Sequence, residues 1–137
     1  MAFTKTGSTS VLNGLIGKSS GPLSSCYIAL SSTAPNADGT NFTEPPASTG
    51  YARAVVGLTS QSATQVMSSP SNGTTVNDRI IFFPEATQSW GTLTHFGLYS
   101  AQNSGTLILY GALSSPITVA SSYVPLFRAG NFSLTLS

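Results

Sequence analysis

The stretch LTHFGLYSAQNSGTLILYGAL, residues 93–113, decides the fold class of this 137-residue chain. Two runs of apolar and small residues, 93–100 and 105–113, flank the segment AQNSG, which has the length of a hairpin loop and ends in glycine. This pattern predicts two antiparallel strands joined by a hairpin connection.

The first run also predicts which side chains face the core. Successive side chains of a strand point to opposite faces, so His95 and Tyr99 share one face and Phe96 and Leu98 share the other. We expect the Phe96 face to be the core face and His95 to point outward. A catalytic histidine needs a positioned partner within hydrogen-bond reach, so an outward histidine on a sheet is more often a solvated side chain.

Further strand-like runs follow one another, separated by turn residues. They occupy residues 26–31, 51–58, 76–84, 115–121 and 131–137. The run 76–84 is so apolar at its centre that it predicts a strand covered on both faces. Short strands with frequent turns predict an all-β fold, an antiparallel β-sandwich of the jelly-roll kind, in a single domain spanning 1–137. A loop over 31–50, rich in Pro, Gly, Asn and Asp, is too long to be a mere connector.

One segment has helical periodicity. In residues 8–18 the apolar side chains of Val11, Leu12, Leu15 and Ile16 fall on one face of a helix. Ser8 or Thr9 is a candidate for the N-terminal cap, and Gly17 for the stop. Two interpretations remain open: the helix packs on its own sheet, which we favour, or it is an arm that packs on a neighbouring subunit.

Charged side chains are sparse. They make up 7% of the residues with a net charge of +1, where about 25% is ordinary. No basic patch or apolar span is present, so we expect neither nucleic acid nor a membrane as a partner. A nearly neutral surface repels its neighbours little, which favours a homo-oligomer or a place in a larger assembly. The N-terminal residues lack the apolar core of a signal peptide, so we expect a protein made in a cytoplasm and not exported by that route.

The inventory of chemically active side chains is small. The carboxylates are Asp38, Glu44, Asp78 and Glu85. Nothing in their spacing selects the closely placed pair that a glycosidase needs. One histidine and one cysteine cannot build an ordinary zinc site. We therefore expect no catalytic residue, no metal site and no cofactor, and hence a protein that is not an enzyme.

The single tryptophan has two interpretations. Trp90 lies just before the strand-like run that begins at residue 93. A large ring at that position either seals the end of a sandwich core, which we favour, or stands exposed as a platform for a sugar or a protein.

Four blocks of sequence together resemble a known family. They are YIALSSTAP (27–35), TEPPASTGYAR (43–53), the long block from IIFFPEATQSWG to LILYGAL (80–113), and FRAGNFSLTLS (127–137). In this order they are similar to small virion proteins of tailed bacteriophages that are commonly labelled phage tail fibre proteins. The likeness runs from about Leu12 to Ser137 and is weaker over 59–74.

The resemblance implies a non-enzymatic structural component of a phage virion, made in the host cytoplasm. The chain has no long repeat or coiled coil of a fibre shaft, so a capsid decoration or accessory role is slightly favoured over a tail-fibre, collar or baseplate module. The expected partners are other virion proteins, such as the major capsid or tail proteins, and further copies of the chain. A carbohydrate-binding module for a host-surface glycan is the alternative of a different class.

Residues of these blocks and of the helical segment are candidates for structural or assembly roles. Arg53 can clamp a carboxylate with two parallel hydrogen bonds. Its candidate partners are Glu85, which follows a strand end, and Glu44, which is closer in sequence. Tyr51 lies beside Arg53 in the same block. The full set of candidates is Leu12, Leu15, Ile16, Glu44, Tyr51, Arg53, Glu85, Trp90 and His95.

Overall fold

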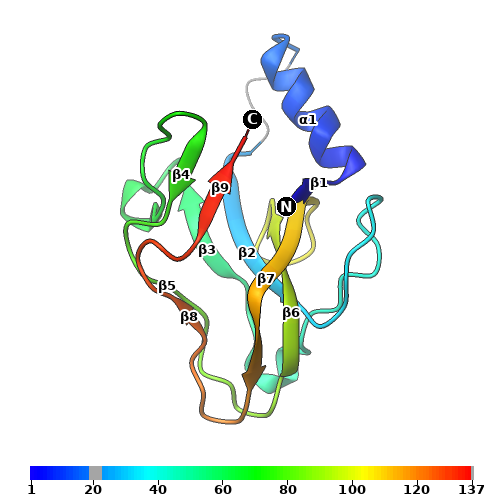
Figure 1. Cartoon of the computed structure of the whole chain (residues 1–137), viewed down its shortest axis with the longest axis vertical. Coiled ribbons are helices and arrows are strands. Elements are labelled where there is room, and N and C mark those ends of the chain that lie inside the picture. Colours follow the sequence, from blue (N-terminus) through cyan, green and yellow to red (C-terminus); the bar gives the residue numbers. More distant parts are fainter. Residues whose placement is uncertain (19–22, 137) are drawn as a thin grey trace.

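The computed structural model describes residues 1–18 and 23–136 (Figure 1). Its strands are β1 (Ala2–Phe3), β2 (Ser25–Ser31), β3 (Ala54–Leu58), β4 (Thr74–Val76), β5 (Ile81–Phe82), β6 (Gly91–Tyr99), β7 (Leu107–Val119), β8 (Leu126–Phe127) and β9 (Ser133–Thr135). The helix α1 spans Lys5–Leu15, and short 3-10 turns occupy Ala47–Thr49 and Ser62–Thr64. Ser137, the last residue of the predicted C-terminal strand, lies outside the described residues.

The strands form a large sheet and two small ribbons. The five-stranded sheet has the order β1-β7-β6-β2-β3, and its paired strands are antiparallel. The ribbons pair β4 with β9 and β5 with β8, and they lie beside the large sheet (Figure 1). The predicted all-β fold of antiparallel sheets with one short helix is confirmed, as is the hairpin of residues 93–113, which forms β6 and β7.

The hydrophobic core joins the large sheet to the ribbons. Leu30, Leu93 and Val119 of the sheet are fully buried, and they belong to one cluster with Ile81 and Phe83 of the β5 segment. Aromatic edge-to-face contacts, such as Phe96 against Phe132 at 5.2 Å between ring centroids, connect the sheet to the chain just before β9. This shared core fixes the ribbons against the sheet.

The face prediction for β6 is partly wrong. Phe96 and Leu98 face the core as expected, but Leu93, which strict alternation places on the outward face with His95, is also fully buried. The pairing register with β7 shifts between Leu93 and His95, so strict alternation is broken there. Because of this shift, Leu93 and Phe96, three residues apart, both point into the hydrophobic core.

The helix begins earlier than predicted. Thr4, rather than Ser8 or Thr9, is the cap, and its side chain accepts a hydrogen bond from the Gly7 N–H. Sequence periodicity missed this start because residues 5–10 carry no apolar side chain. The helix ends as predicted near Gly17, which adopts a left-handed conformation.

The N-terminal half of α1 is fixed to the sheet. Thr4 donates its hydroxyl to the Leu107 carbonyl oxygen at 2.6 Å, and its N–H donates to the Ile108 oxygen at 2.9 Å. A side chain at Gly7 would place a Cβ 2.1 Å from the Ile108 oxygen, so only glycine allows this close approach. The C-terminal half of α1 extends away from the body (Figure 1).

The favoured prediction that the apolar side chains of α1 pack on the protein's own sheet is wrong. Leu12, Leu15 and Ile16 are 57%, 76% and 64% exposed. The helix leaves the sheet after its first turns, so these side chains project beyond the last packed residues. We call Leu12, Leu15 and Ile16 the α1 apolar face.

The run 76–84 is also covered on only one face, against expectation. Ile81 and Phe83 point into the core, whereas Ile80 and Phe82 are 51% and 65% exposed. The run is therefore part of a thin ribbon at the side of the molecule rather than a central strand.

Candidate functional site

The predicted carboxylate clamp of Arg53 exists, with Glu44 as the partner. Arg53 Nε donates to Glu44 Oε1 at 2.9 Å, and Arg53 Nη2 donates to Glu44 Oε2 at 2.8 Å. This is the bidentate geometry that makes arginine–carboxylate pairs strong and directional. The Arg53 side chain is 8% exposed and that of Glu44 is 23% exposed, so the pair is largely withdrawn from water.

The same guanidinium holds the β6–β7 hairpin loop. Arg53 Nη1 donates to the carbonyl oxygens of Ala101 and Ser104 at 2.8 and 2.6 Å. Its Cζ lies 3.5 Å from the centroid of the Tyr99 ring, a cation–π contact. Burial by itself would lower the pKa of Arg53, but the hydrogen bonds and charge of Glu44 outweigh it and the pKa is raised. Arg53 thus stays charged while it joins β3 to two loops.

Tyr51 extends this network toward the core. Its hydroxyl donates to Glu44 Oε1 at 2.6 Å and accepts a hydrogen bond from the Leu30 N–H at 3.1 Å. Burial, and then the Glu44 carboxylate, raise the pKa of the Tyr51 phenol above its ordinary value. Tyr51 remains neutral, and its hydroxyl connects the loop carboxylate to the middle of β2.

Trp90 seals the core next to Tyr51, as favoured from the sequence. It is 6% exposed, and its indole N–H donates to the Thr49 carbonyl oxygen at 2.9 Å. The Trp90 and Tyr51 rings meet edge to face with centroids 5.2 Å apart. The indole is therefore not an exposed platform for a sugar ring.

The remaining candidates from that region lie apart. Glu85 is exposed and does not reach Arg53. His95 is half-buried, and its Nδ1 lies 2.8 Å from the hydroxyl of its neighbour Thr94. The structure therefore brings together Glu44, Tyr51 and Arg53, with Trp90 alongside, and leaves Glu85 and His95 elsewhere.

Sequence reasoning missed one buried polar residue. Asn77 is 1% exposed, and its amide nitrogen donates to the carbonyl oxygens of Arg79 and Arg128, both at 2.9 Å. Its side-chain oxygen accepts from the Phe132 N–H at 2.9 Å. An asparagine before an Asp-Arg pair gives no signal of this role, because two of its three partners, at Arg128 and Phe132, are backbone groups more than 50 residues along the chain.

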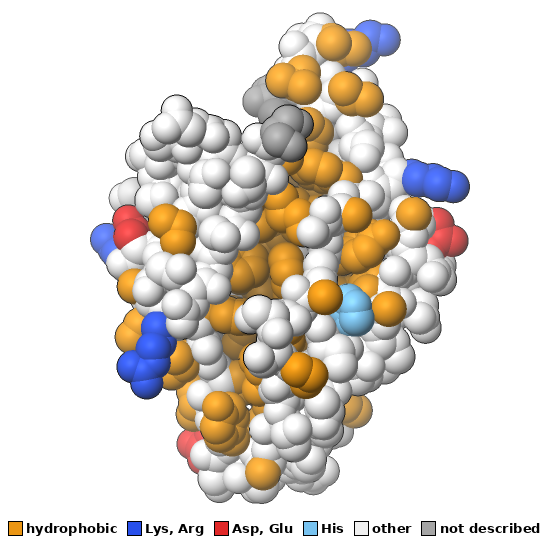
Figure 2. Space-filling view, in the orientation of Figure 1, with side chains coloured by type: hydrophobic (Ala, Val, Ile, Leu, Met, Phe, Trp, Pro, Cys, Tyr) orange, Lys and Arg blue, Asp and Glu red, His pale blue; other side chains and the backbone are white. Residues whose placement is uncertain are grey.

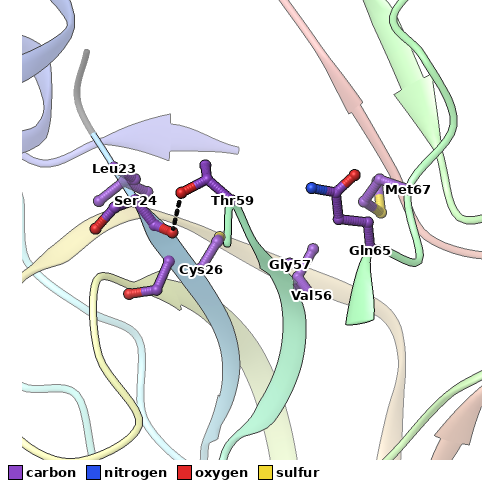
Figure 3. Close-up of a pocket in the computed structure, with 9 residues that line it drawn as sticks. Leu23, Ser24, Cys26, Val56, Gly57, Thr59, Gln65 and Met67 are labelled. Carbon is purple, nitrogen blue, oxygen red and sulfur yellow. Dashed lines mark hydrogen bonds between the residues drawn. The ribbon is translucent and has the colours of Figure 1, made fainter. Parts of the chain in front are cut away.

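The lone cysteine lines a small pocket formed by the paired strands β2 and β3 and the segment that carries Gln65 and Met67. Cys26, Val56, Gln65 and Met67 are among its lining residues, and Thr59 donates its hydroxyl to the Ser24 carbonyl oxygen at its rim (Figure 3). Burial raises the pKa of the Cys26 thiol to about 11. At neutral pH the sulfur is therefore protonated and a poor nucleophile.

Within residues 1–18 and 23–136, no three His, Cys, Asp or Glu side chains lie close enough together to hold a metal ion. In the same described residues, no helix is long and apolar enough to cross a membrane.

Fold and site together define a small all-β protein whose main charged network ties its own loops to its sheet. A family model described as "Podophage GP4 fiber I protein gp80" matches residues 2–135. The chain belongs to this family, so the resemblance to phage tail fibre-type proteins is confirmed and indicates a structural component of a phage virion. A comparison with curated proteins finds no match.

Proposed function

We propose that the chain is a non-enzymatic part of a phage fibre, joined to another virion protein through the α1 apolar face. The observation that carries this proposal is a helix whose first half is fixed to the sheet and whose second half presents three large apolar side chains to solvent. Leu12, Leu15 and Ile16 are each more than half exposed. Fully burying one such side chain stabilises a complex by about 1.5–3 kcal/mol.

The helix is built to project rather than to fray. Its C-terminus is closed by hydrogen bonds from the Lys18 N–H to the Asn13 oxygen at 2.9 Å and from the Gly17 N–H to the Gly14 oxygen at 3.4 Å. This is a Schellman arrangement, which satisfies carbonyl groups that a helix end leaves free. A helix closed at both ends presents the α1 apolar face in one orientation, which lowers the entropic cost of docking.

A non-enzymatic role is supported by the state of the reactive groups. The Glu44 carboxylate is occupied by Arg53 and Tyr51. The Cys26 thiol has a raised pKa. These groups hold the fold and are poorly placed to transfer protons or act on a substrate.

The fibre position is preferred in this proposal because the description of the family model names a fibre protein. The lack of a long repeat or coiled coil is the feature that favours capsid decoration. A carbohydrate-binding role is weakened, because Trp90, the ring best suited to stack on a sugar, is buried in the core. Capsid decoration, collar and baseplate positions remain outcomes of the experiment below.

Removing the α1 apolar face is expected to abolish incorporation into particles while leaving the fold intact. The change is the triple variant Leu12→Ser/Leu15→Ser/Ile16→Ser in phage particles. Surface substitutions usually alter stability by less than about 0.5 kcal/mol, so melting should match that of the wild type. Occupancy is measured by immunogold labelling and particle reconstruction, which also show the position on the virion.

The matched control is Thr6→Ser/Asn13→Gln on the polar side of the same helix, which should be incorporated normally. Full occupancy of the triple variant would contradict attachment through α1. Labelling on the head shell alone would contradict the fibre assignment.

Attachment should also withstand salt. The α1 apolar face carries no charge, so its binding rests on apolar burial and is little affected by ionic screening. Particles washed in about 0.5 M NaCl, where the screening length is only ~4 Å, should retain the protein. Release at moderate salt, measured by immunoblot of pelleted particles, would mean that ion pairs dominate the contact.

A further inference from the structure

The outer face of the β5–β8 ribbon carries a second apolar surface. Ile80 and Phe82 alternate with core residues along β5, and the other members lie in β8 or in the chain just before it. Each is at least 40% exposed: Ile80, Phe82, Tyr123, Val124 and Leu126. We call these five residues the ribbon patch. Phe82 and Leu126 are directly paired across the ribbon, so the patch is contiguous at its centre. Figure 2 shows hydrophobic side chains at this edge of the molecule, next to basic ones.

The ribbon patch is comparable in size to the largest apolar patch of a typical monomeric protein, and such patches are often functional. From the exposed fractions and ordinary side-chain areas, the patch exposes about 350 Å² of apolar surface. Single exposed hydrophobic residues are normal, but contiguous patches of this size often mark interaction sites. The aliphatic members offer nothing to sugar hydroxyls, so the surface suits a protein partner better than a glycan.

Charged residues occur at the two ends of the ribbon patch with opposite sign. Arg79, Arg128 and Asp78 lie at one end, where two positive charges and one negative charge give +1. Glu85 lies at the other end, which therefore carries a charge of −1. It is close to Tyr123, because the N–H of Ala86, the residue after Glu85, donates to the Tyr123 carbonyl oxygen. The distance between these ends is about 16 Å, five residues of extended chain. Exposed arginines around an apolar centre are typical of protein interfaces.

This arrangement is complementary to itself. A two-fold axis through the Phe82–Leu126 pair would place the ribbon patches of two copies face to face and in opposite directions. The basic end of one copy, with Arg79 and Arg128, would then lie over the end of the other copy that carries Glu85, and the reverse contact would form at the other end. Such an isologous contact is the commonest symmetry in homo-oligomers. Parallel stacking would instead place like charges together.

We propose that the ribbon patch is the interface through which a second copy of this chain pairs, about a two-fold axis. Two patches bury about 700 Å² of apolar surface, which at the usual apolar fraction corresponds to a total interface of about 1,200 Å². That value is at the lower limit of stable protein interfaces. The contact forms readily where fibre proteins are concentrated by assembly. It uses a different surface from α1, so it does not depend on the proposed attachment.

The test is the oligomeric state of the purified full chain, measured by sedimentation equilibrium over a wide concentration range. Wild type should dimerise, and Phe82→Ser/Leu126→Ser should raise the dissociation constant by at least about a hundredfold, because two apolar side chains per copy are lost. The triple α1 variant is the matched control and should dimerise like wild type. This control separates failure of the ribbon interface from failure of α1 attachment.

Charge reversal tests the two-fold geometry without altering the apolar centre. Arg128→Glu and Glu85→Arg should each weaken the dimer, and the double variant Arg128→Glu/Glu85→Arg should restore it. These side chains are exposed, so the fold should be retained. A wild type that is monomeric throughout would overturn the proposal. A double variant that fails to recover dimerisation would also overturn it. So would hydrogen exchange that shows the ribbon patch protected only when another virion protein is added.

Discussion

Replacing Arg53 with alanine is expected to lower the free energy of unfolding by about 3 kcal/mol. Removing one partner of a buried ion pair costs about 3–5 kcal/mol, and the partial exposure of Glu44 places this pair at the lower end. The variant also leaves the carbonyl oxygens of Ala101 and Ser104 without their donor. Urea denaturation measures the loss directly, and the melting temperature should fall by about 10 °C.

The control for this experiment is Arg128→Ala, which removes an exposed arginine and should change stability by less than about 0.5 kcal/mol at concentrations where the chain is monomeric. Arg53→Lys tests the geometry, because lysine keeps the charge but cannot form the bidentate pair. It should recover only part of the loss. Equal stability of Arg53→Ala and wild type would mean that the network contributes nothing to the fold.

The second large effect is expected at Asn77. Asn77→Ala should cost about 3 kcal/mol, because it leaves the Arg79 carbonyl oxygen and the Phe132 N–H without partners. It also removes one of two donors to the Arg128 carbonyl oxygen, which keeps the hydrogen bond from the Asn131 N–H. Each buried group left unsatisfied costs about 1–3 kcal/mol, and water entering the site offsets part of the sum. These three backbone groups belong to chain segments around the β5–β8 ribbon, so the ribbon should loosen first.

Hydrogen exchange measures that local effect. Amide protection in Asn77→Ala should fall at residues 80–83, 126 and 127 more than in β6, which lies within the large sheet. Asn131→Ala, at an exposed asparagine, is the control and should leave protection unchanged. A uniform loss of protection throughout the chain would show that Asn77 acts on global stability alone.

Local patterns in the sequence predicted the elements that depend on near neighbours. The β6–β7 hairpin, the burial of Trp90 and the bidentate clamp on Arg53 all follow from short-range composition and side-chain chemistry. Arg53 had two candidate carboxylates in the sequence, and the fold selects Glu44. Glu44 and Arg53 are close in sequence, and the loop that carries Glu44 returns to the sheet at Tyr51. The chain therefore brings the Glu44 carboxylate back to Arg53.

Long-range packing decided what the sequence did not predict. The apolar run at Ile80–Phe83 has the composition of a central strand, but whether its second face is covered depends on elements far along the chain. The α1 apolar face has the periodicity of a packed helix, yet the anchor at Thr4 and Gly7 directs it away from the sheet. In both cases the apolar pattern predicts that a surface becomes buried. It does not show whether the burying surface belongs to the same chain or to a partner.

The anchor of α1 also has a consequence during synthesis. The hydrogen bond from the Thr4 hydroxyl to the Leu107 oxygen spans 103 residues, and β1 pairs with β7 next to it. A ribosome adds about 5–20 residues per second, so the first helix waits roughly 5–20 s before its docking strand exists. Contacts so distant along the chain also slow folding after release. A nascent chain interrupted before β7 would therefore expose Leu12, Leu15 and Ile16 on an unanchored segment, where chaperones and not virion partners would meet them first.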